Sequence, residues 1–187
     1  MRSALLVFLI ALAGSAAFAA DGAIELTDLQ GKRHLPLAVA DQRPVALIFI
    51  SPYCPTANAF LPEINRIAAK YGDRVAFYLV QADPAVTVTD AARQVELYGI
   101  SATVLLDAGQ KLAKQVKATV TPEAVVLGAA SRPLYQGRIN DLYLNRTRKQ
   151  PEPKTHDLVA ALDAILAGQT VPAAVAKAVG CSIPISE

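Results

Sequence analysis

The residues of this chain best suited to chemistry are its two cysteines, Cys54 and Cys181. Cys54 closely follows Val45–Ile50, an unbroken apolar run too short for a buried helix and typical of an interior strand of a parallel sheet. Pro55 then suits the first position of a helix, where a missing N–H costs nothing. Unpaired N–H groups and the dipole at a helix N-terminus favour a thiolate, the form of cysteine that attacks sulfur or oxygen. The sequence therefore predicts a nucleophilic thiolate at Cys54.

The elements that would position this thiolate alternate between strands and helices. After Cys54, apolar residues recur at helical spacing as far as Tyr71, and the strand is followed by further apolar runs. We expect helices at 55–71, Val88–Tyr98, Lys111–Val116 and 157–167, and strands at 75–81, Thr103–Leu106 and Glu123–Leu127. A hairpin turn is expected at 128–132, and the polar stretch 145–154, with four basic residues and two prolines, is expected to be an exposed loop. Thr87 or Thr89 would cap the second helix and Thr155 the last one. This order predicts an α/β domain with a sheet covered on both faces.

The segment around Cys54 resembles the active-site segment of the thioredoxin-like superfamily. The resemblance rests on the strand, the turn, the Cys-Pro-Thr-Ala helix start at 54–57 and Pro62, eight residues after the cysteine. It is strongest to secreted redoxin-domain proteins, the group related to alkyl hydroperoxide reductase and thiol-specific antioxidant proteins and to TlpA-like periplasmic thioredoxins. It implies a thioredoxin-like fold, with a central mixed sheet flanked by helices.

Three positions depart from the patterns of these families. Ala57 stands where thioredoxins carry the second cysteine of Cys-x-x-Cys, and Tyr53 replaces their tryptophan. Ser51 fits the Thr/Ser that precedes the peroxiredoxin cysteine by three residues, but Leu47 occupies the proline position of that motif. The resemblance is therefore specific for the fold and permissive for the reaction.

Thr121-Pro122, immediately before an expected strand, resembles the cis-proline that faces the cysteine in this superfamily. This resemblance implies that Thr121 presents its backbone beside Cys54, where a substrate polypeptide could pair as an added strand. Glu123 comes next, and two interpretations of it are open. It could exchange a proton near the sulfur, or it could be a solvent-facing residue at the start of a strand.

For Cys181, the resemblance of the Gly-Cys-Ser-Ile ending to the tails of redoxin-like proteins favours pairing with Cys54. Cys181 would then be the resolving cysteine and would replace the one that is absent at Ala57. Some peroxiredoxins likewise carry their resolving cysteine near the C-terminus. A permanent disulfide that fixes the tail, and two unpaired thiols, are the alternatives.

Three functions are compatible with this pattern. The first is a thiol-disulfide oxidoreductase in which Cys181 resolves the mixed disulfide. The second is a thiol peroxidase in which Cys54 becomes a sulfenic acid and Arg138 or Arg93 polarises the peroxide. The third is a non-enzymatic copper-handling or assembly protein that uses Cys54, Cys181 and His156. The redox functions imply a protein disulfide or peroxide as substrate, a periplasmic thiol reductant as partner and no cofactor.

The N-terminus has the features of a secretory signal peptide. Residues 1–19 contain Arg2, an apolar core and a small-residue end, so we expect cleavage before Ala20 and a periplasmic or secreted protein without a stable membrane anchor. A retained anchor is the alternative, although the apolar core is shorter than the roughly 20 residues that span a bilayer. The expected domain occupies 20–168 and a tail occupies 169–187. With 18 basic and 16 acidic residues the net charge is +2, which does not favour nucleic-acid binding, and the sequence contains no indication of oligomeric state.

Overall fold

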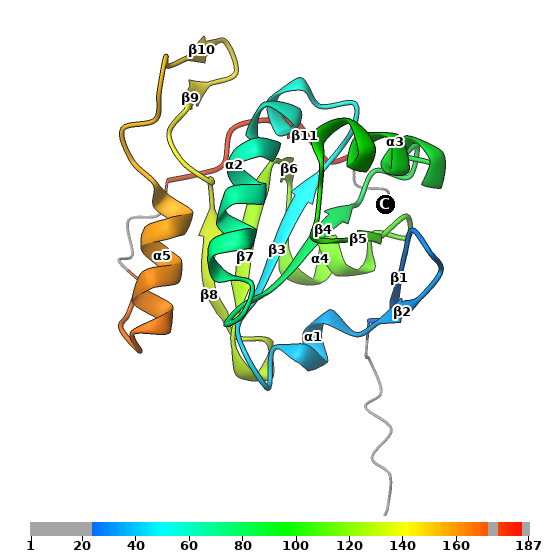
Figure 1. The fold of residues 1–187 in the computed structure, drawn as a ribbon, viewed down its shortest axis with the longest axis horizontal. Coiled ribbons are helices and arrows are strands. Elements are labelled where there is room, and N and C mark those ends of the chain that lie inside the picture. Colours follow the sequence, from blue (N-terminus) through cyan, green and yellow to red (C-terminus); the bar gives the residue numbers. More distant parts are fainter. Residues whose placement is uncertain (1–23, 172–175, 185–187) are drawn as a thin grey trace, which may run out of the picture.

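A computed structural model describes residues 24–171 and 176–184 of the chain (Figure 1). The expected signal peptide lies outside the described residues. The main sheet has seven strands in the order β2-β1-β5-β4-β3-β7-β8. Its strands are β1 (Leu26–Asp28), β2 (Arg33–His34), β3 (Val45–Ile50), β4 (Ala76–Gln81), β5 (Thr103–Leu106), β7 (Glu123–Leu127) and β8 (Pro133–Gly137). The helices are α1 (Pro36–Val39), α2 (Pro55–Tyr71), α3 (Val88–Tyr98), α4 (Lys111–Val116) and α5 (Asp157–Leu166), with a 3-10 turn at Ala129–Ser131.

The sheet is mixed, as expected. β3 pairs in parallel with β4 and antiparallel with β7, so that Ile48 lies between Leu79 and Ala124. All six residues of β3 are fully buried. A strand that is buried on both faces has no polar alternation, which explains the unbroken apolar run in the sequence.

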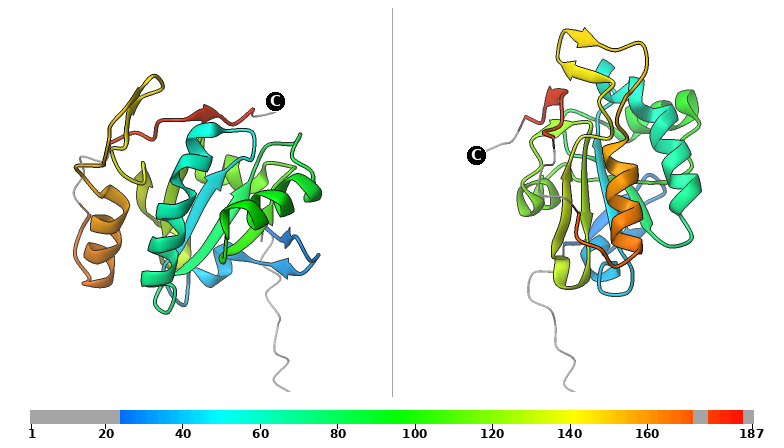
Figure 2. Two further views of the ribbon diagram at one scale, coloured as in Figure 1. Left: turned by 45° about the horizontal axis from the view of Figure 1, so that its top comes forward. Right: turned by 90° about the vertical axis from the view of Figure 1, so that its left-hand side faces the viewer.

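Two hydrophobic clusters cover the two faces of the sheet. Ala46, Ile48 and Ile50 of β3 pack in the cluster that holds the apolar faces of α2 and α5. Val45, Leu47 and Phe49 of the same strand point the other way and pack with residues of α1 and α4. Figure 1 and the two views of Figure 2 show α2 and α5 beside each other along the sheet. The expected α/β class, with helices on both faces, is confirmed.

The ends of α3 are those expected from the sequence. Thr87 is the N-cap, and its side chain accepts a hydrogen bond from Asp90 N–H while the Asp90 carboxylate accepts from Thr87 N–H, which completes a capping box. At the other end Gly99 adopts a left-handed conformation with φ 59°. Glycine is favoured there because it has no Cβ to clash.

Two expectations about the C-terminal half were wrong in detail. Thr155 does not cap α5: His156 is at the N-cap without a side-chain cap, and the Thr155 hydroxyl donates to Asp157 instead. The segment 145–154, expected as a loop, includes part of a small hairpin formed by β9 (Tyr143–Asn145) and β10 (Arg148–Lys149). This hairpin projects beyond the body of the domain (Figure 2).

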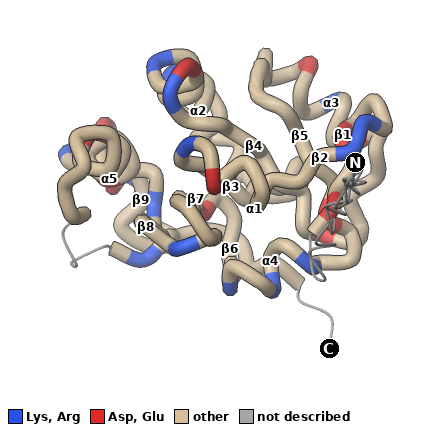
Figure 3. Tube along the Cα trace, turned by 90° about the horizontal axis from the view of Figure 1, so that it is seen from below, with Lys and Arg blue, Asp and Glu red and all other residues tan. Residues whose placement is uncertain are grey.

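The surface charge agrees with the near-neutral composition. Helix α2 carries both signs of charge, and its Glu63 and Arg66 form an ion pair with a 2.7 Å N–O distance (Figure 3). Among the described residues, no helix is both long enough and apolar enough to cross a membrane.

The turn between β5 and α4 is held by a buried carboxylate. Asp107 is 1% exposed, and its oxygens accept hydrogen bonds from Leu112 N–H (3.2 Å) and Ala113 N–H (2.8 Å). Burial raises the pKa of Asp107, although these N–H donors oppose the rise. This carboxylate therefore fixes the start of α4 at the cost of burying a charge.

We expect Asp107→Ala to lower the free energy of unfolding by about 1–3 kcal/mol, because it leaves two buried N–H groups unpaired. The control is Asp107→Asn, which keeps one oxygen acceptor and carries no charge, so its loss should be smaller. Urea unfolding at pH 7 measures both. Because the raised pKa means that the folded protein binds the proton more tightly, the contribution of Asp107 to stability should decline as pH rises through its folded pKa. Equal stabilities for wild type and Asp107→Ala would contradict this role.

Candidate functional site

The sulfur of Cys54 lies at the N-terminus of α2. Cys54 is the N-cap residue, with extended backbone angles, and its carbonyl accepts the first helical hydrogen bond from Asn58 N–H. Its Sγ atom accepts a hydrogen bond from Ala57 N–H at 3.3 Å. The expected position of Cys54 is confirmed. Ala57, which replaces the second cysteine of a Cys-x-x-Cys motif, contributes its backbone N–H to the sulfur instead.

Residues far apart in the sequence meet above this sulfur. Two short strands, β6 (Val120–Thr121) and β11 (Cys181–Ser182), pair antiparallel, so that Cys181 is opposite Thr121. The Thr121 carbonyl accepts a hydrogen bond from the Cys54 thiol at 3.1 Å. Cys181 also hydrogen-bonds to Cys54 through its thiol, and both cysteines are free in this structure. The pairing of the tail with β6 therefore places the Cys181 thiol next to the Cys54 thiol.

This contact separates the acidities of the two thiols. Burial raises the pKa of Cys54, but hydrogen bonds to its sulfur from the side chains of Cys181 and Thr121 and from Ala57 N–H outweigh this effect, and the net pKa is below that of an ordinary cysteine. Burial, the hydrogen bond to Cys54 and repulsion by its negative charge raise the pKa of Cys181 to about 11. Of the two reduced cysteines, Cys54 is therefore the one that loses its proton more readily, and the Cys181 thiol can donate a hydrogen bond to the thiolate that results.

The loop opposite the cysteine has the expected geometry. The Thr121–Pro122 peptide bond is cis. Glu123, directly after it, is 7% exposed, so the interpretation as a solvent-facing residue is wrong. Its carboxylate accepts hydrogen bonds from Thr119 N–H (2.8 Å) and from the Gln136 amide (3.2 Å). Glu123 therefore braces the loop that carries Thr121.

A network of side-chain amides supports the turn before Cys54. Asn58 donates to the Pro52 carbonyl at 2.9 Å, Gln94 donates to Asn58 at 2.6 Å, and Gln81 donates to Gln94 at 2.7 Å. Tyr53, which is 54% exposed, donates its hydroxyl to Asp90. The turn is thus tied to both β4 and α3, which holds the sulfur at a fixed place.

A small cavity of about 80 Å³ adjoins the two sulfurs. Its walls include Ser51, Cys54, Thr121 and Cys181, four of the residues expected at the site from the sequence. Ser51 accepts a hydrogen bond from Tyr53 N–H with its hydroxyl oxygen. Asp83 is the one carboxylate among the described residues of this wall, and the sequence analysis did not single it out. Its place directly beyond the carboxyl end of a parallel strand is the signal that could have identified it.

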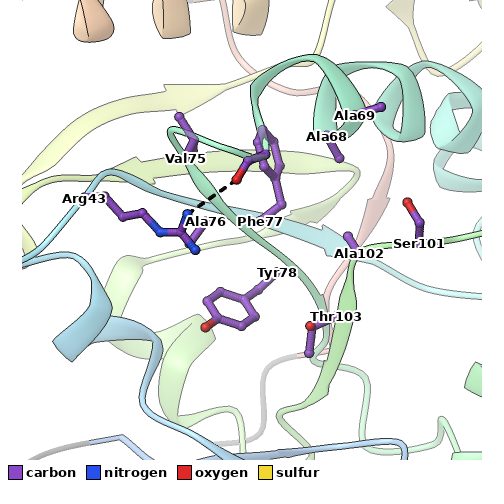
Figure 4. Close-up of a pocket in the computed structure, with 11 residues that line it drawn as sticks. Arg43, Ala68, Ala69, Val75, Ala76, Phe77, Tyr78, Ser101, Ala102 and Thr103 are labelled. Carbon is purple, nitrogen blue, oxygen red and sulfur yellow. Dashed lines mark hydrogen bonds between the residues drawn. The ribbon is translucent and has the colours of Figure 1, made fainter.

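A roomier cavity of about 290 Å³ lies away from the cysteines (Figure 4). It is next to Ala76 and Tyr78 of β4, which pair with Val45 and Leu47 near the start of β3, whereas Cys54 follows the other end of that strand. Figure 4 shows Arg43 at its edge, with its guanidinium group donating to the Gly72 carbonyl at 3.4 Å. The cavity contains no described cysteine, so size alone does not mark the reactive site.

Other residues considered from the sequence do not line the cavity at the sulfurs. Arg138 donates from its guanidinium group to both carboxylate oxygens of Asp157. Arg93 lines a surface pocket with Tyr53 and Leu97 rather than the cavity at the sulfurs. His156 lies 3.8 Å from Glu63. In the described part of the chain, no three histidine, cysteine or acidic residues form a group that could hold a metal ion.

Comparison with known proteins was informative only at the level of structure. No protein-family model matches the chain, and no curated protein matches it. A hypothetical protein from Sinorhizobium meliloti superposes with a TM-score of 0.76 at 25% identity, over 87% of this chain and 91% of that one. An uncharacterised conserved protein from Geobacillus kaustophilus gives 0.75 at 25% identity, over 88% and 90%. A secreted Mycobacterium tuberculosis disulfide oxidoreductase homologous to Escherichia coli DsbE gives 0.56 at 20% identity, over 73% and 91%.

The two thiols should titrate as a linked pair. We expect Cys181→Ala to raise the pKa of Cys54, because the thiolate loses a hydrogen-bond donor, and Cys54→Ala to lower the pKa of Cys181 from about 11, because the neighbouring negative charge is gone. The rate of iodoacetamide alkylation against pH, with peptide mapping, measures both.

Cys181→Ser is the matched control for this titration, since a hydroxyl can still donate to the thiolate. Its effect on the pKa of Cys54 should be smaller than that of alanine. Identical titration curves for Cys54 in the wild type and in Cys181→Ala would contradict the linkage.

Proposed function

Because the chain has a thioredoxin-like fold, we propose that it is an exported thiol-disulfide oxidoreductase in which Cys54 is the nucleophile and Cys181 the resolving cysteine. The observation that carries this proposal is the meeting of the two cysteines at Thr121: β11 places Cys181 opposite Thr121, the Thr121 carbonyl accepts from the Cys54 thiol, and both cysteines line one cavity. The lowered pKa of Cys54 and the raised pKa of Cys181 agree with this contact. Unequal acidities assign the roles, because the thiolate is the form that attacks.

The reaction begins with the Cys54 thiolate. It attacks one sulfur of a substrate disulfide, the substrate S–S bond breaks, and the leaving sulfur takes up a proton. A mixed disulfide between Cys54 and the substrate results. The N–H of Ala57 and the helix dipole stabilise the thiolate before the attack.

Formation of the mixed disulfide changes the acidity of Cys181. The negative charge and the hydrogen-bond acceptor on Cys54 disappear, so two of the causes that raise the pKa of Cys181 are removed, while the attraction of Arg146 remains. Cys181 can then lose its proton and attack the sulfur of Cys54. The mixed disulfide breaks, and the substrate leaves with both of its cysteines reduced. The protein is left oxidised, with a Cys54–Cys181 disulfide that a periplasmic thiol reductant then reduces.

No described residue near the sulfurs favours a peroxidase over this reaction. Neither arginine considered for polarising a peroxide lines the cavity at the sulfurs: Arg138 is paired with Asp157, and Arg93 lines a neighbouring pocket that shares Tyr53 with that cavity. Disulfide exchange needs only the two thiols and the loop at Thr121.

Turnover assays of cysteine variants test the proposal. We expect Cys54→Ser to abolish reduction of insulin disulfides, and Cys181→Ser to complete one attack but remain trapped as a mixed disulfide, with multiple turnover lowered at least tenfold. Nonreducing peptide mass mapping after oxidation should find Cys54 joined to Cys181. Full turnover by Cys181→Ser would exclude the resolving role, and rapid consumption of hydrogen peroxide with no insulin reduction would favour the peroxidase.

Export has its own measurement. We expect the chain expressed with its N-terminus in a Gram-negative host to be recovered from the periplasm beginning at Ala20, because residues 1–19 have the charge, apolar core and small-residue end of a signal peptide. Intact mass and N-terminal sequencing check this. A chain that retains Met1 in the membrane fraction would instead support an anchor.

A further inference from the structure

The C-terminal segment of this chain lies on the loop beside Cys54 in the manner of a bound peptide. Cys181 pairs with Thr121 and Ser182 with Val120, and Ile183 N–H donates to the Thr119 carbonyl at 2.9 Å. Three consecutive tail residues thus follow the backbone edge 119–121. Backbone pairing of this kind gives affinity, while the side chains that enter pockets give selectivity.

The first selective position is Gly180. A Cβ placed on Gly180 would lie 1.9 Å from the Thr121 carbonyl oxygen and 2.6 Å from its carbon. Contacts below 3.0 Å essentially never occur for real Cβ atoms, and both of these are with backbone rather than with a flexible side chain. The surface beside Thr121 therefore accepts only glycine immediately before the cysteine.

The second selective position lies two residues after the cysteine. Ile183 is 6% exposed and joins the hydrophobic cluster that contains Leu112 and Ala113 of α4. Ser182, between the two, is exposed. Beyond Ile183, the buried Gln110 amide donates to the Pro184 carbonyl at 2.8 Å and to the Ala82 carbonyl at 2.9 Å. The body of the domain therefore provides an aliphatic pocket and a backbone clamp that follows it.

We propose that the edge 119–121, with the glycine position beside Thr121 and the aliphatic pocket at α4, is a sequence-selective groove for extended polypeptides of the form Gly-Cys-polar-aliphatic. The tail 180–183 is its tethered occupant in this structure. The inference rests on the proposed function, since the cysteine of such a substrate would be the sulfur that Cys54 attacks. It adds the class of substrate: protein disulfides in which one cysteine follows glycine and precedes an aliphatic residue by two positions.

Because substrate and tail use the same groove, substrate binding and the attack of Cys181 on the mixed disulfide must take place one after the other. A substrate strand on the edge 119–121 occupies the place of Cys181, so the tail must leave when the substrate binds. Cys181 regains its position opposite Thr121 only when the substrate strand withdraws, and it then lies next to Cys54 again. The same edge would thus hold the substrate cysteine during the first exchange and the resolving cysteine during the second.

Peptide binding to the full chain tests the groove without any redox step. The probe is a fluorescent peptide with the sequence of residues 179–184 in which serine replaces the cysteine. We expect it to bind the full-length Ile183→Asp variant, whose own tail loses its apolar anchor, and to bind wild type at least tenfold more weakly, because a tethered tail competes at an effective concentration of the order of millimolar. Fluorescence anisotropy measures both affinities.

Selectivity is measured with two altered peptides. Replacing the peptide's glycine with alanine, or its isoleucine with aspartate, should each weaken binding to Ile183→Asp at least tenfold. Ser182→Asp is the matched control variant: it puts the same charge on an exposed tail residue, so it should behave like wild type. Gly180→Ala releases the tail through a different contact and should bind the probe as Ile183→Asp does, which guards against a folding defect in one variant.

The outcomes separate this inference from the proposed function. Failure of both released-tail variants to bind the probe, or equal binding of the glycine and alanine peptides, would overturn the groove whatever the insulin assay gives. Selective binding of the probe by a protein that reduces no disulfide would support the groove and contradict the proposed oxidoreductase function.

Discussion

The short pairing of β11 with β6 determines the chemistry available to this molecule. It joins residue 181 to residue 121, sixty positions away, and brings the two thiols of the chain into hydrogen-bonding contact. Without it, Cys54 would be a single thiol at a helix N-terminus, able to form a mixed disulfide but with no partner in the chain to release it. With it, each thiol sets the acidity of the other.

The same pairing explains how Cys54 can be both buried and suited to reaction. A cysteine that is 1% exposed among apolar side chains would ordinarily be inert, because burial favours the neutral thiol. Here part of the covering is the tail itself, and the tail supplies a hydrogen-bond donor rather than hydrocarbon alone. The cover belongs to a short strand paired through few backbone contacts, so a competing strand can replace it at less cost than disrupting the sheet.

Local sequence signals predicted the elements that hold the site, and long-range contacts account for what they missed. The apolar run of β3, the proline after Cys54 and the capping residues of α3 act within a few positions, and the corresponding elements are found where they were expected. The short β9–β10 hairpin carries no strong apolar alternation, and the cap expected at Thr155 was lost because its hydroxyl donates to Asp157. The burial of Glu123 depends on Thr119 and Gln136, and the closeness of Gly180 to Thr121 depends on a pairing across the whole domain. No periodicity records such contacts.

The replacement of a second cysteine by Ala57 then has a physical consequence beyond the loss of a thiol. In a Cys-x-x-Cys motif both sulfurs belong to one helix turn, so the resolving thiol stays in place while a substrate occupies the neighbouring loop. In this chain the helix keeps only the stabilising N–H of Ala57, and the resolving thiol lies on a strand that uses the Thr121 edge. Substrate and resolving cysteine therefore compete for one set of backbone hydrogen bonds. The two steps are therefore ordered: Cys181 approaches Cys54 as the substrate strand leaves the Thr121 edge. The substrate strand and Cys181 cannot both lie beside Cys54 at the same time.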